Sequence, residues 1–298
     1  MNTALEPYLT VIRAARPALD IITAELNTDG MANAVVVVND ALVFRFPKTE
    51  VARELQRYET ALLGAIQTRL PVAVPQVEAQ TEEFAQYRLV PGEPLYRHRL
   101  LSAEPEAQDQ VLAQLGAFLA ALHTISLDGL PVPPWQQPRQ HQTARSRALS
   151  RLEQVQQQLY PHIWRDQRAW IEHLYAPIME GTLELDGFTP CLIHADLASY
   201  HLLAAPDPWR LSGVIDFGTA GAGDPAVDIG LLLNTYGESL VRRLAETYPM
   251  SVELLDRARF FAGSLELEWA LAGIRENDVS MLLVHLGRAR DIQPIGTR

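Results

Sequence analysis

The stretch CLIHADLASYHLLAAPDPWRLSGVIDFGTAGAGDPAVD, residues 191–228, contains short apolar runs that end in polar side chains. The run Cys191–Ile193 leads into His194-x-Asp196, and a later run leads into Asp216-Phe217-Gly218. Short apolar runs bounded by turn residues are typical of buried strands. We therefore expect two carboxylates, those of Asp196 and Asp216, to lie at the ends of two strands.

A segment rich in turn residues separates these two runs. Two prolines, an aspartate and a glycine between residues 206 and 213 allow the chain to fold back as a hairpin. The hairpin would bring Asp196, His201 and Asp216 to one edge of a cleft. Phosphoryl transfer needs a group that accepts the proton of an attacking hydroxyl, and ligands that hold magnesium against nucleotide phosphates. An isolated aspartate at a strand end is often only a turn or capping residue, but the joint spacing favours a catalytic interpretation.

Composition and charge exclude several other classes of protein. The chain has 298 residues, of which 48% are hydrophobic and 20% charged, so it can bury a large core and is not a mainly disordered protein. Its 36 acidic and 25 basic residues give a net charge of -11, which is the wrong sign for a nucleic-acid binder and suits a cationic ligand. We expect no nucleic-acid partner, and a monomer or a dimer.

The single cysteine and the N-terminal segment indicate a cytoplasmic protein. Cys191 stands alone, which excludes an intramolecular disulfide and the usual cysteine zinc sites. Glu6, Arg13 and Arg16 precede any long apolar run, so this segment is typical of neither a signal peptide nor a membrane span. We expect no membrane association.

The order of apolar patterns predicts a strand-rich first part and a helical second part. Pro91-Gly92-Glu93-Pro94 marks the boundary, which divides the chain into a first lobe, 1–92, and a second lobe, 93–298. The first lobe has an amphipathic opening segment, strands over 21–26, 34–38, 41–46, 75–80 and 86–91, and a helix over 50–66. The second has helices over 106–123, 139–160 (exposed) and 228–287, and short strands over 191–193, 202–205 and 211–215.

The quoted stretch resembles the aminoglycoside phosphotransferase family, bacterial small-molecule kinases related in fold to protein kinases. The family has an H-x-D-x-x-x-x-N catalytic loop and an I-D-F/W-G metal motif. The resemblance implies that Asp196 is the catalytic aspartate and Asp216 a metal ligand, and that Asp224 and Asp228 brace the lobe. His201 stands where most members have asparagine, as in the aminoglycoside 2''-phosphotransferase and macrolide phosphotransferase branches. Histidine is an uncommon magnesium ligand, so its direct metal contact is less secure than that of Asp216.

The resemblance also implies a fold and cofactors. The expected fold is α+β and bilobal, like that of a protein kinase, with a five-stranded antiparallel sheet plus a helix in the first lobe and a mainly helical second lobe. The expected cofactors are Mg²⁺ and ATP or GTP as the phosphate donor.

The first lobe supplies the residues that the resemblance places at the nucleotide. The loop with Gly30 and Asn33 lies where the family has its phosphate-covering loop, although an ordinary hairpin turn has the same pattern. Arg45 occupies the place of the family's lysine, and its planar guanidinium is not a neutral replacement for a point charge. Lys48, the only lysine in the chain, is then interpreted as a solvated charge at the rim.

A counter-charge and a hinge complete this nucleotide site. Glu59 has the spacing of the family's helical glutamate, and Glu54, the competitor, lies about 140° away around the helix. Arg88 and Val90 lie in the segment that resembles the hinge between the lobes, where backbone groups would contact the purine.

Helices after Asp228 are placed like the family's acceptor-binding helices. Glu238, Glu266, Glu268 and Trp269 are the candidate substrate contacts, since carboxylates attract a polycationic aminoglycoside and an indole covers a sugar face. The alternative interpretation is that the glutamates are solvated and Trp269 belongs to the core. A macrolide needs a more apolar wall, for which Trp135, Trp164 and Trp170 are available.

Three functional hypotheses follow. The first is a nucleotide-dependent, magnesium-dependent O-phosphotransferase that acts on an aminoglycoside antibiotic. The second keeps the same chemistry with a macrolide or another metabolite hydroxyl as acceptor. The third is a nucleotide-binding pseudokinase, which the departures at Arg45 and His201 would permit.

Overall fold

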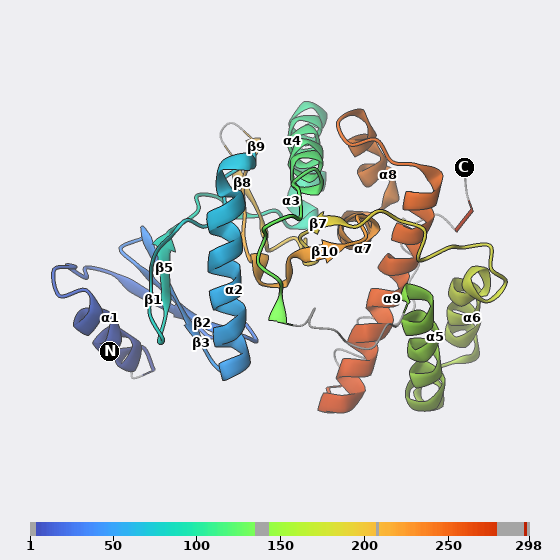
Figure 1. Ribbon diagram of the computed structural model, residues 1–298, viewed down its shortest axis with the longest axis horizontal. Helices are drawn as coiled ribbons and strands as arrows, with labels where there is room; N and C mark the ends of the chain where they lie inside the picture. The colour runs from blue at the N-terminus through green and yellow to red at the C-terminus, as the bar shows by residue number, and fades with distance from the viewer. Residues whose placement is uncertain (1–3, 135–142, 207–208, 279–294, 297–298) are drawn as a thin grey trace.

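The first part of the chain forms a five-stranded antiparallel sheet. The computed structural model describes residues 4–134, 143–206, 209–278 and 295–296. The strand order is β1-β2-β3-β5-β4 (Figure 1). This sheet and the helical remainder of the chain confirm the expected α+β fold. The strands are β1 (Ala24–Asn27), β2 (Asn33–Val38), β3 (Leu42–Pro47), β4 (Val77–Gln80) and β5 (Ala85–Arg88).

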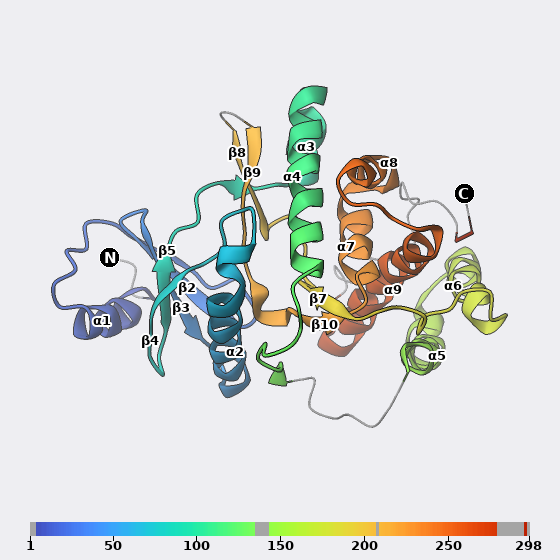
Figure 2. The same ribbon diagram turned by 45° about the horizontal axis from the view of Figure 1, so that its top comes forward.

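Helices α1 (Glu6–Ala15) and α2 (Glu50–Ile66) cover the two faces of this sheet. Leu9 and Ile12 of α1 join a buried cluster with the valines of β2 and the phenylalanines of β3. Figure 2 shows α2 on the other face, between the sheet and the C-terminal helices. The Thr49 side chain accepts a hydrogen bond from Ala52 N at 3.1 Å, a cap that contributes about 1 kcal/mol to helix stability.

The turn between β2 and β3 has the expected hairpin chemistry. Asn39 and Asp40 have φ angles of 54° and 49°, as a two-residue hairpin turn of the primed type requires. The Asn39 Oδ1 atom also accepts hydrogen bonds from Ile22 N and Thr23 N at 2.8 and 3.0 Å. This turn fixes the β2–β3 register, which places Arg45 opposite Val35, and the neighbouring β5 places Ala85 on its other side.

The second part of the chain is mainly helical. Helices α7 and α9 pack along each other, and a Cβ atom at Gly230 would lie only 2.9 Å from Ala258 O. Helices α5 and α6 lie on the far side of α9 from the sheet (Figure 1). The helices are α3 (Arg97–Ser102), α4 (Pro105–His123), α5 (Ala144–Gln154), α6 (Arg165–Met179), α7 (Ala226–Tyr236), α8 (Glu238–Val241) and α9 (Val252–Glu276).

Two small antiparallel sheets flank the segments that carry Asp196 and Asp216. Strand β7 (Cys191–Ile193) pairs with β10 (Gly221–Gly223). Strand β8 (Leu202–Pro206) pairs with β6 (Glu93–Pro94) and with β9 (Trp209–Val214), which forms the expected hairpin. The ends of β7 and β9 therefore come close together.

Backbone contacts join the two parts of the molecule. Ala73 forms a parallel bridge with Gly213, and Val214 N donates to Ala73 O at 2.9 Å. A Cβ atom at Gly213 would lie 2.3 Å from Val90 Cγ1, so only glycine fits without rearrangement. The division of the chain at residue 92 stays a prediction.

The described part of the predicted helix 139–160 begins at residue 143, and residues 139–142 lie outside the described residues. Helix α5 ends at Gln154 and continues as a π-helical turn over Val155–Leu159. Val155 and Leu159 are fully buried against other helices, whereas the three glutamines between them are exposed, so this is a surface segment with one buried face. The narrow apolar seam in its sequence is a core contact.

The helices predicted over 228–287 are present as α7, α8 and α9 up to Glu276. Asn277 adopts a left-handed conformation with φ of 55° and ends α9, and the remainder of the predicted range, to residue 287, lies outside the described residues. Across the described ranges, no helix is both long enough and apolar enough to cross a membrane.

Candidate active site

The candidate catalytic loop, residues 194–201, begins where β7 ends. Ala195 has a φ angle of 63°, a left-handed conformation that is unfavourable for a residue other than glycine. Strained residues of this kind persist only where neighbouring groups hold them, and they cluster at active sites. The side chain of Asp196, the next residue, is 36% exposed.

Asp228 in the first turn of α7 holds this strained backbone. Its buried carboxylate accepts a hydrogen bond from Ala195 N at 2.7 Å on Oδ1 and from His194 N at 2.9 Å on Oδ2. Asp224 has a different partner, the Arg257 guanidinium, with Nε–Oδ2 and Nη2–Oδ1 distances of 2.7 and 3.1 Å.

His194 is a buried, neutral imidazole. Its Nδ1 atom lies 3.2 Å from Asp196 N, so Nδ1 accepts and Nε2–H donates to Ile215 O at 3.2 Å. Burial lowers the pKa of this imidazole to about 4, although nearby Asp228 favours the charged form. His194 therefore links the catalytic loop to the end of β9.

Asp216 follows β9 and also has a left-handed backbone, with a φ angle of 66°. Its Oδ1 atom lies 3.3 Å from Arg45 Nη2, and its side chain is 39% exposed. Burial alone would raise the pKa of Asp216, but the neighbouring groups, of which the Arg45 guanidinium acts most strongly, outweigh burial and lower the pKa. Asp216 is thus an ionised carboxylate at the edge of the site.

His201 lies between the two aspartates. Its Nδ1 atom is 2.8 Å from Asp196 O, a backbone carbonyl that can only accept, so Nδ1 carries the hydrogen. In the neutral ring, Nε2 then presents its lone pair to Asp216 Oδ2, which is 3.4 Å away. Two electron-pair donors, Asp216 Oδ2 and His201 Nε2, thus lie 3.4 Å apart, close enough to be ligands of the same cation.

The environment of Asp196 favours a proton acceptor. Burial raises the pKa of this carboxyl, and the negative charge of Asp216 raises it further, whereas His201 acts in the opposite direction. A general base works best when its pKa is not far below the working pH. The position and the electrostatics of Asp196 therefore suit acceptance of a hydroxyl proton.

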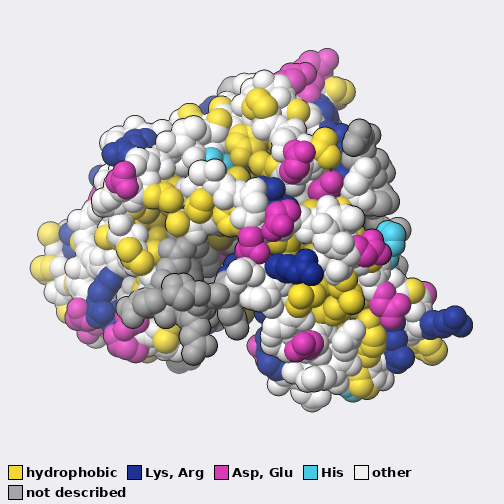
Figure 3. Space-filling view, turned by 45° about the vertical axis from the view of Figure 1, so that its right-hand side comes forward, with side chains coloured by type: hydrophobic (Ala, Val, Ile, Leu, Met, Phe, Trp, Pro, Cys, Tyr) yellow, Lys and Arg dark blue, Asp and Glu magenta, His cyan; other side chains and the backbone are white. Residues whose placement is uncertain are grey.

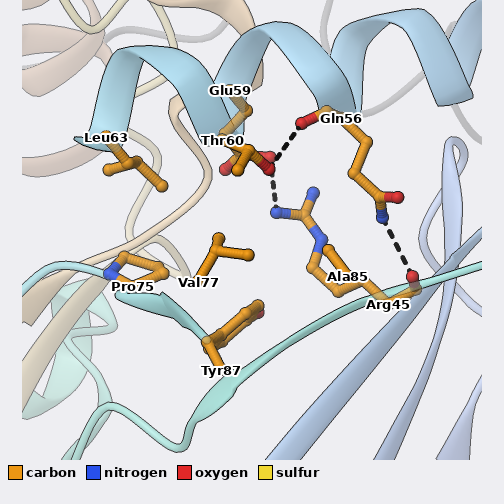
Figure 4. A pocket seen from close by; sticks show the side chains of 9 residues that line it. All are labelled: Arg45, Gln56, Glu59, Thr60, Leu63, Pro75, Val77, Ala85 and Tyr87. Carbon is orange, nitrogen blue, oxygen red and sulfur yellow. Dashed lines mark hydrogen bonds and ion pairs between the residues drawn. The ribbon is translucent and has the colours of Figure 1, made fainter. Parts of the chain in front are cut away.

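Arg45 and Glu59 form a buried ion pair between β3 and α2 (Figure 4). Arg45 Nη1 lies 2.7 Å from Glu59 Oε2, and Glu59 Oε1 accepts from Phe217 N at 3.0 Å. The structure brings Glu59, not the exposed Glu54, to Arg45. Burial would lower the pKa of Arg45, but Glu59 more than compensates and raises it. Glu59 thereby connects α2 to the residue that follows Asp216.

Two further residues, Gln56 and Tyr87, lie close to Arg45 although no sequence motif indicated them. Gln56 Nε2 donates to Arg45 O at 2.9 Å, and Tyr87 lines the same cavity of about 10 Å³, which is about the space of one water molecule (Figure 4). The sequence feature that could have indicated Gln56 is its position three residues before Glu59, on the same face of α2.

The loop between β1 and β2 is fastened by Lys48. Its Nζ atom donates to Thr28 O at 2.7 Å and to Gly30 O at 2.5 Å. Lys48 is exposed, as expected, but its ammonium group is hydrogen-bonded to the loop and is not only solvated. Asn33, at the start of β2, is 9% exposed, and its Oδ1 atom has no hydrogen-bond partner among the described residues.

The two predicted hinge residues lie in different environments. The Arg88 side chain is 77% exposed and its Nε atom pairs with Glu78 Oε1 at 2.9 Å. Val90 is buried against Gly213. Neither side chain joins the cluster around Asp216.

The candidate acceptor residues do not join that cluster either. Glu238 is 1% exposed and pairs with Arg259 and Arg242, with Nε–Oε2 and Nε–Oε1 distances of 3.1 and 2.8 Å. This carboxylate is therefore occupied within the core, and we do not include it in the proposed acceptor site.

The other two glutamates of this group are also paired. Glu266 is 3% exposed and accepts a hydrogen bond from the Asn234 side chain. Glu268 forms an ion pair with Arg151 of α5, and Trp269 is half-buried on α9.

The tryptophans considered for a macrolide wall are dispersed. Trp164 is 79% exposed at the start of α6, beside a shallow depression lined by Arg165, Asp166 and Ala169. Trp170 packs against the α5–α9 core, and Trp135 lies outside the described residues.

Asp216 and His201 can hold a divalent cation only together with the phosphates of a bound nucleotide. Among the residues that the structure describes, no three histidine, cysteine or acidic side chains are arranged to hold a metal ion. Asp216 and His201 Nε2 supply two donors, and magnesium is commonly held by one or two carboxylates plus substrate phosphates. Asp216, as an oxygen donor, fits magnesium better than His201 does.

These features define a small-molecule kinase with a protein-kinase-like fold. The chain matches the phosphotransferase enzyme family over residues 23–261, and it belongs to this family.

The chain is similar to several phosphotransferases, whose names refer to different antibiotics. The chain is 25% identical to viomycin phosphotransferase of Streptomyces vinaceus, over 82% of this chain and 85% of the relative. It is similar to the GDP and kanamycin complex of aminoglycoside 2''-phosphotransferase IIIa, with a TM-score of 0.81, 25% identity, and coverage of 94% and 96%. It also shares the fold of a macrolide 2'-phosphotransferase of Brachybacterium faecium, with a TM-score of 0.69, 21% identity and coverage of 99% of both chains.

Proposed function

We propose that this protein transfers the γ-phosphate of ATP or GTP to a hydroxyl group of an aminoglycoside. The observation that carries the proposal is the convergence of Arg45, His201 and the two strand-end aspartates, within contact distances of 3.3–3.5 Å. Membership of the phosphotransferase family and the likeness to a GDP and kanamycin complex support it.

Asp196 accepts or orients the proton of the attacking hydroxyl. Its raised pKa and partial exposure suit this role, and its orientation is set by the backbone that Asp228 holds. A hydroxyl oriented toward the phosphate gains rate from positioning, because little covalent chemistry is required of the protein.

Arg45 binds the phosphates of the nucleotide. Its guanidinium is held by Glu59, and its Nη2 atom already faces Asp216, so the positive charge is preorganised at the edge of the site. The loop with Gly30 and Asn33, which Lys48 fastens, covers the phosphates, and the backbone of the segment with Arg88 and Val90 contacts the base.

Asp216 and His201 would hold magnesium, which neutralises the charge of the phosphates when it is bound. Asp216 supplies an ionised oxygen, and His201 supplies its Nε2 atom, because its Nδ1–H is bound to the Asp196 carbonyl.

A neutral or weakly charged acceptor, such as a macrolide, is the second candidate. Glu238, Glu266 and Glu268 are all paired within the protein, so a polycation would have to compete with existing partners. Acidic and basic side chains are also interspersed on the face drawn in Figure 3 and form no acidic field there.

The test is nucleoside diphosphate release in the presence of potential acceptors. ATP and GTP are each supplied with and without magnesium, and the acceptors are kanamycin, viomycin, a macrolide and a simple amino alcohol. Asp196→Asn is the blank, and Asp128→Asn, an exposed loop position, is the matched control. Mass spectrometry of the acceptor then identifies the product.

Release stimulated by kanamycin, with a phosphorylated product, supports the proposal. Stimulation by the macrolide alone replaces it with the second candidate. Nucleotide binding without release for any acceptor contradicts phosphotransfer and favours a pseudokinase. A cytoplasmic location and the oligomeric state remain expectations from the sequence.

A further inference from the structure

A chain of hydrogen bonds extends behind the catalytic loop. Asp228 Oδ2, which accepts from His194 N, also lies 3.1 Å from His123 Nε2. His123 Nδ1 in turn lies 2.7 Å from Tyr248 Oη. The three side chains come from the last residue of α4, the first turn of α7 and the segment that follows residues 242–246.

The direction of each bond follows from the groups involved. A carboxylate can only accept, so His123 Nε2–H donates to Asp228. In the neutral ring, Nδ1 is then an acceptor, and the Tyr248 hydroxyl donates to it. Tyr248 thus selects the histidine tautomer that Asp228 requires.

The three side chains of this hydrogen-bond series are buried. The side chains of His123 and Asp228 are 7% and 0% exposed, and Tyr248 is 9% exposed. The rings of His123 and Tyr248 meet edge to face, with centroids 5.4 Å apart. Hydrogen bonds in such an environment are strong, and a buried polar group that loses its hydrogen-bond partner lowers the stability of the folded protein.

We propose that His123 and Tyr248 are positioning residues that hold the Asp228 carboxylate and thereby the backbone of the catalytic loop. Both oxygens of Asp228 bind this backbone, and the Ala195 N–H to which Oδ1 binds belongs to the residue with the left-handed conformation. A rotation of the carboxylate would release Ala195 and displace Asp196, which follows it. The catalytic consequence rests on the proposed function, whereas the backbone consequence does not.

The test compares two tyrosines that each donate one buried hydrogen bond. Tyr248→Phe removes the bond to His123. Tyr236→Phe is the matched control, because the Tyr236 hydroxyl donates to Leu95 O at 2.6 Å and not to His123. We compare both variants with the unmodified chain by hydrogen exchange of individual backbone amides.

We expect the amides of His194 and Ala195 to exchange about fivefold faster in Tyr248→Phe and to be unchanged in Tyr236→Phe. This measurement needs no substrate, so it stays valid if phosphotransfer is absent. Equal exchange at both amides in the two variants would overturn the proposal.

Kinetics test the consequence for the reaction. We expect kcat of Tyr248→Phe to fall about fivefold with an unchanged nucleotide KM, because a displaced base slows chemistry more than binding. An equal loss in Tyr236→Phe would show a general effect of destabilisation and contradict the proposal.

A double substitution tests whether Tyr248 acts on Asp228 through His123. In a His123→Gln background, Tyr248→Phe should have no further effect on amide exchange, because the link to Asp228 is already broken. Additive effects would show that Tyr248 acts by another route and overturn the assignment of His123 as the link.

Discussion

The acidic residues at the strand ends and those on the C-terminal helices contrast in how their charges are paired. Asp196 and Asp216 have side chains that are 36% and 39% exposed, and the Arg45 and His201 side chains lie 3.3–3.5 Å from them. Glu238 is 1% exposed and pairs with Arg259 at 3.1 Å. The strand-end carboxylates retain capacity for a ligand, whereas the carboxylate of Glu238 is used in holding α8 to α9.

This contrast shows that residue type alone does not mark a binding site. A buried carboxylate must be paired, and the pairing that stabilises it also removes it from recognition. An available carboxylate is one that the backbone holds in place while its side-chain partners remain at longer distances. The following expectations test this distinction.

The largest effect is expected for Asp196→Asn. Loss of the proton acceptor should lower kcat by about 10³-fold, within the range of general-base catalysis. Diphosphate release with the best acceptor measures the effect, and Asp128→Asn should keep full activity. An Asp196→Asn protein that retains more than a tenth of the activity would exclude Asp196 as the base.

Glu59→Gln and Glu238→Gln should separate a catalytic ion pair from a structural one. Each substitution leaves a buried arginine without its full counter-charge, so each should lower the free energy of unfolding by about 3–5 kcal/mol in urea titrations. Only Glu59→Gln should also raise the nucleotide KM, because Arg45 loses its orientation.

These kinetic measurements are made at a temperature where both variants are folded. A raised acceptor KM in Glu238→Gln, with unchanged nucleotide KM, would return Glu238 to the acceptor site.

His194 should make the protein less stable in acid. Its folded pKa of about 4 lies below the unfolded value of about 6.5, so the unfolded state binds the proton more readily. This contribution is fully present above about pH 6.5 and is lost as the pH falls toward 4, with a total of about 3 kcal/mol.

Unfolding free energies at several pH values measure this loss. His194→Gln can keep both hydrogen bonds and should be less sensitive to acid, whereas His98→Gln, at an exposed position, should behave like the unmodified chain. An identical pH dependence in all three proteins would contradict this origin.

The smallest effect is expected for Glu268→Gln. Its partly exposed pair with Arg151 should contribute at most about 1 kcal/mol to the free energy of unfolding. The acceptor KM should change by less than twofold, as in the control Glu276→Gln on the same helix. A selective rise in the KM for kanamycin would instead identify Glu268 as an acceptor ligand.

Much of the fold could be predicted from local sequence patterns. The Asn39-Asp40 turn and the helix after Thr49 depend on interactions between residues close in the chain. The hairpin between Asp196 and Asp216 likewise follows from turn residues within one segment. Such local rules explain why the architecture could be read from the sequence.

The partners of the helical glutamates could not be predicted in the same way. Glu238 and Arg259 are 21 residues apart, and their contact depends on the packing of α8 on α9. The same holds for Gln56, whose bond to Arg45 depends on how α2 lies across the sheet. Helical periodicity gives the face of a residue but not the side chain that meets it.

The bridge between Ala73 and Gly213 bears on how a nucleotide would enter and leave. Because backbone pairing ties the two parts of the molecule beside the hinge segment, they cannot separate widely without breaking it. The loop between β1 and β2 is held by the Lys48 side chain through hydrogen bonds to Thr28 O and Gly30 O, which can break without disturbing that pairing. We therefore expect the opening of this loop, and not a swing of the two parts, to set the residence time of the nucleotide.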